Sequence, residues 1–507
     1  MFGIIFGWIR RLIERSRIRR QLRDTERQND VNKNVVEHHD APVEAYVNRD
    51  HSENILVSGN NKQIRDRVCC SAAYNAFSAG EGVVILHCGN AELESLLLDA
   101  FDGSSGLHLI NESNQFYDPF LDMDKNQIAQ LVLSSATESC KVQHNGGIYI
   151  KGLTDYLLAR GQVPCARSYI RCPHDSMWQR IQEHVRNGDM ASHVAEEIND
   201  ELTRGQVERG NVEHYFNVLN SQAGTILADK DVIKSGNGIN IRRAVNRNQV
   251  IVFDITPSAS DLLMNVLLQE IKNSMSEGKR FTFVLDSIPA DASEALGKLL
   301  RNFSSKCKFV FSAEDAYAET ASIDNLFDSL LGKADTVFIS QHSSAETSER
   351  FSNYLGKYQK MEINNTFTAG DTYSTYGQIL PGSSNTNIYG IQRVDRPRVE
   401  ESEITGLSSN TLFIKKERRS EIIKAHCIGG NARGTCGEPR RRLTQIRSTI
   451  RTNWVLFVFL LIFTPPIGLL YGLITSGRRG KIVFGILLFL MVALFIIGGI
   501  IISTQGY

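Results

Sequence analysis

The sequence predicts an α/β fold: a mostly parallel sheet interrupted by an all-α insertion and followed by a C-terminal transmembrane helical hairpin. Short apolar runs alternate with helical patterns, one long stretch is helical throughout, and two long apolar stretches end the chain. Strands that alternate with helices favour a doubly wound parallel sheet. The length of 507 residues and a hydrophobic content of 42% allow two or three domains. The formal net charge is zero, so any contact with nucleic acid or lipid must come from local patches.

The first strand and helix have the order of a phosphate-binding segment. Residues 54–59 form an apolar run that ends in Gly59, and residues 67–79 have helical periodicity. A working phosphate loop has the form G-x-x-x-x-G-K-[ST], in which bare backbone amides and a lysine hold the phosphates and the hydroxyl holds magnesium.

The residues needed for phosphate chemistry are missing. Counting from Gly59 puts Ile64, Arg65 and Asp66 in the last three positions of the pattern. A bulky side chain blocks backbone approach, a guanidinium does not copy a compact ammonium, and a carboxylate repels phosphate. A second register through Lys62 lacks the second glycine and the hydroxyl. A strand and helix from a fold that never bound phosphate remain the alternative.

A second element strengthens the comparison. Residues 280–287 form a hydrophobic strand that ends in Asp286 and Ser287. In a phosphate-loop ATPase such an aspartate supports magnesium, and a following glutamate polarises the attacking water. Ser287 occupies the position of that glutamate, so the sequence predicts lost hydrolysis.

Further strands and helices complete the predicted domain. Helical spacing over 175–229 is marked by Trp178, Ile181 and Val185. Another helix is expected over 260–276, and additional strands are expected over 82–88, 248–255, 308–312 and 336–340. We therefore expect the sheet to be interrupted by a mainly helical insertion.

The nine cysteines contain no C-x-x-C pair. Two zinc combinations can be written, but neither has the usual ligand spacing: Cys165, Cys172 and His174, or His426, Cys427 and Cys436. We expect reduced structural thiols and no metal site.

The C-terminal apolar stretches cover 454–474, beginning at Trp454, and 482–502. Each is long enough to span a hydrocarbon core of about 30 Å. Arg478 and Arg479 lie between the stretches, and the counts of basic residues favour a cytoplasmic main domain in a multi-pass protein of the cell membrane. Pro465 and Pro466 interrupt the first stretch, so a re-entrant segment is the alternative.

The N-terminus carries a different membrane signal. Residues 1–9 are apolar and are followed by six arginines within 10–20. This pattern predicts an amphipathic helix over 1–23 on an anionic lipid surface, with a solvated or partner-binding basic helix as the alternative. A flexible polar linker is expected over 24–52 and a basic linker over 427–452.

The order of these segments resembles the type IV coupling proteins of bacterial conjugation and type IV secretion. The residues 116–120 are similar to the Asn-Pro-Phe turn of that family, and the helical insertion follows where the family has its all-α domain. Core strands match at 249–254, 283–286 and 307–316, and the segments 342–356 and 396–407 resemble a later helix and the closing segment.

This resemblance implies a RecA-like P-loop NTPase domain, ring assembly at the membrane, and movement of DNA or protein substrates. It implies a RecA-like domain over 53–125 and 235–426 with an insertion over 126–234. The two transmembrane segments expected within 453–503 depart from the family, whose membrane anchor is usually at the N-terminus. Glu314 stands where the family often has glutamine. The remnant nucleotide positions would be Gly59, Lys62, Arg65, Asp66, Asp286 and Glu314.

The predicted function is that of a pseudo-ATPase that assists assembly, recruitment or regulation beside a DNA-transfer or secretion apparatus. No cofactor is favoured, although residual ATP binding with magnesium or slow hydrolysis is one alternative. A structural membrane subunit without nucleotide is the other alternative. The expected partners are the lipid bilayer, further copies or an intact ATPase homologue, and components of the apparatus. A direct DNA-binding role has less support because no basic aromatic stripe is visible in the core.

Overall fold

The computed structural model describes residues 20, 22–101, 106–255, 261–287, 294–301, 307–371, 383–417, 419–427 and 440–441. The chain divides into two compact units. The core unit comprises Asn34–Lys357 and Pro397–Arg440, and the second unit comprises Met1–Lys33, Tyr358–Arg396 and Arg441–Tyr507.

An eleven-stranded sheet runs through the described part of the core unit, in the order β13-β1-β12-β11-β8-β2-β7-β6-β3-β5-β4. From β8 to β4 all neighbouring strands are parallel. These strands are β8 (Thr336–Ile339), β2 (Ile55–Ser58), β7 (Cys307–Ala313), β6 (Phe281–Asp286), β3 (Gly82–His87), β5 (Val250–Asp254) and β4 (Leu107–Ile110). The mostly parallel sheet predicted from the sequence is therefore confirmed.

The other end of the sheet mixes strand directions. β11 (Thr411–Lys416) is antiparallel to both β8 and β12 (Ile422–Cys427), whereas β1 (Val35–Ala41) is parallel to β12. The short strand β13 (Arg440–Arg441) lies beside β1.

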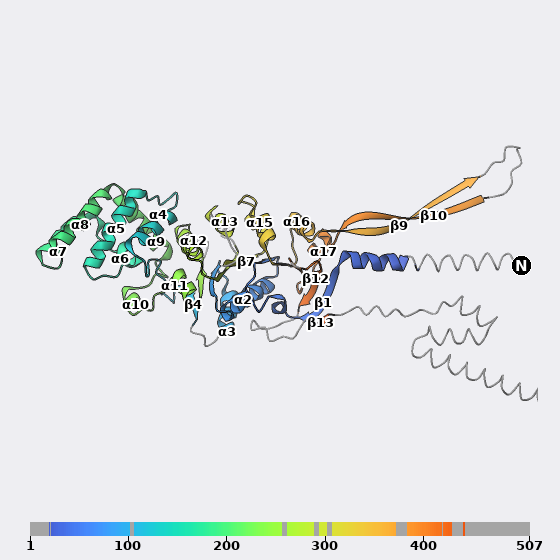
Figure 1. The fold of residues 1–507 in the computed structure, drawn as a ribbon, viewed down its shortest axis with the longest axis horizontal. Coiled ribbons are helices and arrows are strands. Elements are labelled where there is room, and N and C mark those ends of the chain that lie inside the picture. The colour runs from blue at the N-terminus through green and yellow to red at the C-terminus, as the bar shows by residue number, and fades with distance from the viewer. Residues whose placement is uncertain are drawn as a thin grey trace, which may run out of the picture. The chain divides into compact units, whose positions relative to one another are not determined.

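Helices cover both faces of the sheet (Figure 1). One face carries α2 (Lys62–Ser78) and α3 (Ala91–Ala100). The opposite face carries α12 (Asp261–Ser276), α13 (Glu294–Arg301), α15 (Leu326–Lys333) and α16 (Ala345–Leu355). Along β3, Val83 and Ile85 pack into the hydrophobic cluster on one face, and Val84 and Leu86 pack into the cluster on the other. Burial on both faces explains why these strands are continuous apolar runs.

The helical insertion lies beyond the β4 end of the sheet (Figure 1). Its principal helices are α4 (Lys125–Ser135), α5 (His144–Ala159), α6 (Ala166–Ile170), α7 (Met177–Arg186), α8 (Ser192–Arg204), α9 (Arg209–Ala223) and α10 (Lys230–Lys234). The remaining short helices of the core unit are α11 (Ile241–Asn246), α14 (Ala316–Thr320), α17 (Glu401–Thr405), η1 (Val43–Tyr46), η2 (His174–Ser176) and η3 (Gln206–Glu208).

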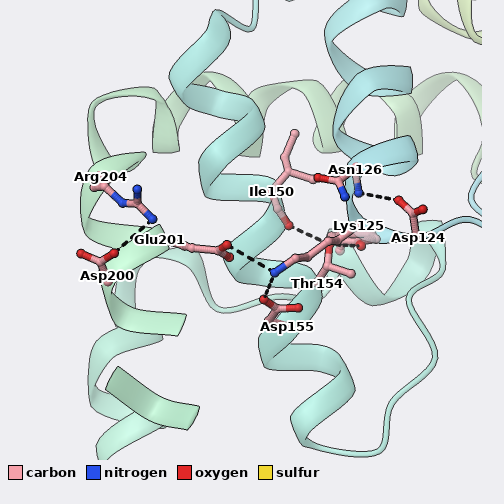
Figure 2. A network of polar contacts seen from close by, with 10 residues as sticks. Asp124, Lys125, Asn126, Ile150, Thr154, Asp155, Asp200, Glu201 and Arg204 are labelled. Atoms are coloured by element: carbon pink, nitrogen blue, oxygen red, sulfur yellow. Dashed lines mark hydrogen bonds and ion pairs between the residues drawn. The ribbon is translucent and has the colours of Figure 1, made fainter. Parts of the chain in front are cut away.

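A lysine joins three helices of the insertion, as Figure 2 shows. The Nζ atom of Lys125 on α4 donates to Asp155 on α5 at 2.5 Å and to Glu201 on α8 at 3.3 Å. The side chains of Lys125 and Asp155 are about one third exposed, so this network orients the helices more than it stabilises them.

A buried glutamate fastens the insertion to the sheet domain. The hydroxyl of Tyr117, on the segment entering the insertion, donates to Oε1 of Glu270 on α12 at 2.6 Å. The amide of Ile241, on the segment leaving it, donates to Oε2 at 2.9 Å. Both crossing segments are therefore held by one side chain, which we call the Glu270 clamp.

The second unit contains elements that the sequence analysis did not predict. Residues 22–33 are helical, and β9 (Lys357–Asp371) pairs with β10 (Ser383–Pro397) in a hairpin. Asn29 donates to the carbonyl of Met361 at 2.9 Å and accepts from its amide at 2.7 Å. The hairpin had been expected to form part of the α/β domain.

The segment 24–52 is not the flexible linker that we expected. It contains the end of the helix, β1 and η1, and its side chains Ala41, Val43 and Tyr46 are buried in the core. The polar composition of this segment did not indicate a strand, because β1 is held by backbone pairing with β12, which does not depend on apolar side chains.

Among the residues that the structure describes, none of the helices has both the length and the apolar character needed to cross a membrane. The two C-terminal apolar stretches, with Trp454, Pro465, Pro466, Arg478 and Arg479, lie outside the described residues. The expected amphipathic segment over 1–23 lies almost entirely outside them, and so does most of the basic linker over 427–452.

Candidate nucleotide site at the carboxyl edge of the sheet

The residues predicted to be nucleotide remnants surround the carboxyl edge of the parallel strands. Gly59 follows β2, Asp286 ends β6, and Glu314 follows β7. Strand β7 lies between β2 and β6, so Ser312 near its end separates the two predicted remnants. Ligands of open α/β sheets bind outside this edge.

The connection between β2 and α2 is shorter than a phosphate loop. Only Gly59, Asn60 and Asn61 lie between the two elements. The side chain of Asn61 accepts a hydrogen bond from the amide of Ile64 at 3.1 Å, which caps the helix and fixes its start. The phosphate-loop pattern places four residues between its glycines before the helix-opening lysine. No comparable loop is available here to wrap around phosphate.

This geometry corrects the register assumed from the sequence. Ile64, Arg65 and Asp66 lie inside α2 and are buried, rather than in a loop. The count from Gly59 assumed the spacing of the motif, but the Asn61 cap begins the helix three residues after the glycine. Lys62, the alternative candidate, is half-exposed and pairs with Glu92 at 3.0 Å.

The backbone of the short loop is used within the protein. The amide of Gly59 donates to the carbonyl of Ala313 at 3.2 Å, and the amide of Asn60 donates to the carbonyl of Gln341 at 2.8 Å. Gly59 has a φ of 133°, and a Cβ placed there would lie 2.0 Å from the Oγ of Ser340. The glycine is thus required by close packing and backbone conformation.

Arg65 turns its guanidinium back to this loop. Its Nη1 atom donates to the carbonyl of Gly59, and the residue is only 7% exposed. A buried cation bonded to a carbonyl of the loop is not presented to an external phosphate.

Asp286 belongs to a buried polar cluster, which we define as Asp66, Asn90, Asp286 and Ser312. The amide nitrogen of Asn90 donates to Asp66 Oδ1 at 2.7 Å and to Asp286 Oδ2 at 2.6 Å. The hydroxyl of Ser312 donates to Asp286 Oδ1 at 2.6 Å. Both carboxylate oxygens of Asp286 therefore have protein donors, and all four residues are buried. A magnesium ion would have to displace these hydrogen bonds.

The electrostatics of the cluster alter the protonation of Asp66. The pKa of Asp66 is raised to about 6, chiefly by burial; the Asn90 amide opposes the rise and the nearby Asp286 carboxylate adds to it. An isolated buried carboxylate favours its neutral form. Asp66 therefore takes up a proton at a higher pH than a free aspartate does.

Two further predicted residues are not part of the cluster. Ser287 has a φ of 67°, and its amide donates to the carbonyl of Ser312 at 2.7 Å. Glu314 is exposed, and its amide is capped by Glu319 at 3.1 Å. No carboxylate stands at the position of Ser287 to orient water.

Asn90 was missed by the sequence analysis, although it joins the two aspartates. Its side-chain oxygen also accepts the amide of Leu93 at 3.2 Å and so caps α3. The dipeptide Gly89-Asn90 after a buried strand was the available local signal for a helix cap. Asn90, Asp66 and Asp286 belong to three different elements, so no local sequence pattern predicts the contacts between them.

His87, at the end of β3, lies close to two carboxylates at the same edge. Its Nε2 atom is 3.2 Å from Glu94, and its Nδ1 atom is 3.8 Å from Asp254. The amide of Asn90 donates to Nδ1 at 3.1 Å, so that nitrogen is already occupied. This group links α3 to the strand ends.

The cysteines of the first zinc combination lie in the insertion. Cys165 and Cys172 are buried, and burial raises the pKa of both thiols, that of Cys172 to about 12. Protonated thiols are poor metal ligands. Cys436 of the second combination lies outside the described residues.

Comparisons with known proteins find similarity at the level of structure. No family model and no curated protein sequence matches the chain. The unbound bacterial conjugative coupling protein TrwBdeltaN70 is 14% identical, with 75% of this chain and 86% of that chain covered and a TM-score of 0.47. Plasmid coupling protein TrwB bound to a non-hydrolysable ATP analogue is 13% identical, with 76% and 88% covered and a TM-score of 0.46.

VirB4 of Thermoanaerobacter pseudethanolicus is 9% identical, with 74% of this chain and 90% of that chain covered and a TM-score of 0.38. All three are matches of structure at low sequence identity, and they cover about three quarters of this chain.

Proposed function

We propose that this chain is a membrane-anchored pseudo-ATPase that serves as an assembly, recruitment or regulatory component of a conjugative DNA-transfer or type IV secretion apparatus. The proposal rests on the carboxyl edge of the sheet, where the candidate nucleotide-binding groups already bond to other groups of the protein. The loop after β2 is too short to surround phosphate, Arg65 is bonded to Gly59, and both oxygens of Asp286 accept protein hydrogen bonds.

The physical reason is that nucleotide binding would require several internal contacts to be broken together. Leaving a buried polar group unpaired costs about 1–3 kcal/mol. A magnesium ion at Asp286 would displace Asn90 or Ser312, and phosphate at Gly59 would displace the backbone contacts with Ala313 or Gln341. The closed arrangement therefore favours a structural role over turnover.

The membrane part of the proposal is supported by the two apolar stretches near the C-terminus and the basic N-terminal segment. The expected location is the cell membrane with the core unit on the cytoplasmic side. Further copies of the chain, or an intact ATPase homologue, are the proposed partners.

The proposal is tested in the host by a DNA-transfer or protein-secretion assay. Deleting the chain should reduce transfer, whereas Asp286→Asn, at matched protein levels on immunoblots, should leave it within about twofold of wild type. Asp328→Asn, an exposed site on α15, is the matched control. A loss of transfer with Asp286→Asn in a protein of unchanged abundance and membrane association would contradict the proposed pseudo-ATPase role.

A further inference from the structure

Two histidines stand side by side at the mixed end of the sheet, far from the carboxyl-edge cluster in strand order. His39 on β1 is the direct register partner of His426 on the parallel strand β12. Their rings are stacked, with centroids 4.5 Å apart and planes 1° from parallel. Register partners on adjacent strands project from the same face of a sheet, so the pair is fixed by the backbone.

A carboxylate completes a group of three candidate ligands. Glu37 precedes His39 by two residues and therefore lies on the same face of β1. Its Oε2 atom is 3.8 Å from His39 Nε2. One donor atom from each of Glu37, His39 and His426 lies within 4.8 Å of the others. Local sequence spacing does not reveal this group, because His39 lies near the start of the core unit in sequence and His426 lies near its end.

We infer that Glu37, His39 and His426 form a site for a divalent transition-metal ion of the zinc class. Two imidazole nitrogens and one carboxylate oxygen are ligands that suit zinc, and three protein ligands leave one position for water. Two nitrogens bound to one zinc at about 2.0–2.1 Å each lie about 3.4 Å apart. To bring both lone pairs onto one ion, the partly exposed rings must rotate out of their stacked arrangement into other side-chain rotamers.

A hydrogen bond behind His426 prepares this residue to act as a ligand. Its Nδ1 atom lies 3.0 Å from the hydroxyl of Thr411 on β11, and that hydroxyl lies 2.6 Å from the hydroxyl of Ser408. Such outer contacts orient a ligating histidine and leave the other ring nitrogen for the metal.

One charged neighbour opposes the metal. Lys424 is the register partner of Glu37, and its Nζ atom lies 4.0 Å from Glu37 Oε1. The ammonium group competes for the carboxylate and repels a divalent cation. Replacing Lys424 by alanine should therefore strengthen metal binding, whereas a variant that merely unfolds the protein would weaken it.

A metal at this site would join the first long strand of the core unit to a strand close to its end in sequence. β1 follows the N-terminal segment, and β12 precedes the segment that leads to the C-terminal apolar stretches. The ion would hold these two strands together, independently of the proposed function.

The test is calorimetric titration of the purified full-length chain with zinc, and absorption spectroscopy with cobalt as a substitute ion. We expect one equivalent of tightly bound metal and a cobalt spectrum of nitrogen and oxygen ligands without a thiolate charge-transfer band. His39→Gln and His426→Gln should each weaken binding by at least about tenfold, and Thr411→Val by about tenfold. Lys424→Ala should tighten it.

His193→Gln, on the exposed face of α8, is the control that should not change binding. Circular dichroism establishes that each variant is folded. Absence of binding at millimolar metal would overturn the inference, as would affinity that survives both histidine substitutions or a cobalt spectrum dominated by thiolate. If either histidine variant failed to fold, the metal affinities of Thr411→Val and Lys424→Ala would test the site instead. Affinities equal to that of the wild type in both variants would reject it.

Discussion

At the scale of single residues, the candidate nucleotide site is closed by side chains that replace a ligand with internal partners. Asn90 bridges Asp66 and Asp286, and Ser312 occupies the remaining oxygen of Asp286. Arg65 bonds to Gly59 from within the same helix that would otherwise present phosphate-binding groups. These residues keep the order of a nucleotide site along the chain, but Arg65 and both oxygens of Asp286 already bond to other groups of the protein.

Asp66 gives a prediction for the dependence of stability on pH. Its pKa is raised on folding from 3.8 to about 6, so between these values the folded state binds more protons than the unfolded state. The wild-type carboxyl therefore favours folding at low pH, and this contribution is lost as pH rises through about 6. The free energy of unfolding of Asp66→Asn relative to wild type should rise by roughly 1–3 kcal/mol over that range.

Urea unfolding of both proteins at a series of pH values measures this difference. The side-chain amide oxygen that the Asp66→Asn substitution introduces can still accept from Asn90, so the hydrogen bond is retained. Asp328→Asn, at an exposed position, should show no comparable trend. A difference between Asp66→Asn and wild type that stayed constant from pH 4 to 7 would show that the pKa of Asp66 is not raised.

At the scale of elements, the Glu270 clamp determines how the insertion is attached to the sheet domain. The single carboxylate accepts from Tyr117 at the entry and from Ile241 at the exit. Burial raises the pKa of Glu270 to about 8, and the hydrogen bonds from Tyr117 and Ile241 oppose that shift. The clamp is therefore sensitive to the loss of either donor.

Tyr117→Phe tests the clamp with a minimal change in shape. Removing the buried hydroxyl leaves an oxygen of Glu270 without that donor, which should lower the free energy of unfolding by about 1–3 kcal/mol. Hydrogen exchange should increase in α11 and in the entry segment. Tyr156→Phe is the matched control, because among the described residues the hydroxyl of that buried tyrosine accepts only a long hydrogen bond of 3.5 Å, from Arg160. Equal stability of the two variants would argue against the clamp.

Elements were predictable where a continuous apolar run or a helical period was present. The helix expected over 260–276 is α12 (Asp261–Ser276), and the buried strands β3 and β6 lie where their apolar runs indicated. β1 was missed because its residues Glu37, His38 and His39 are polar and its pairing depends on a distant strand. The hairpin β9–β10 was missed because its long strands show no sustained apolar alternation.

The location of the candidate site was predictable from the sequence, but the internal hydrogen bonds that close it were not. Gly59 and Asp286 follow or end buried strands, and parallel strands bring their carboxyl ends to one edge. The closed state depends on where α2 begins and on the contacts of Asn90, which join residues distant in sequence. Counting along a motif could not supply either fact.

At the scale of the whole molecule, the core unit depends on its first strand as well as on the predicted α/β segments. Deleting residues 34–53 from a fragment spanning 34–441 should destabilise or aggregate it. Val43, Tyr46 and Val47 are buried in the core, and each large apolar side chain contributes roughly 1.5–3 kcal/mol. Size-exclusion chromatography and urea unfolding of the fragments 34–441 and 54–441 compare the two. Equal stability of both fragments would show that β1 is dispensable.

The central claim is that the carboxyl edge of the sheet does not bind nucleotide. Isothermal titration of the folded full-length chain with Mg-ATP tests it most directly, with Arg65→Ala and Asp286→Ala as matched variants. We predict no saturable heat up to millimolar nucleotide for all three proteins, because the internal contacts already occupy the site. Micromolar binding by the wild-type chain that both substitutions abolish would contradict this account and restore a nucleotide-binding function.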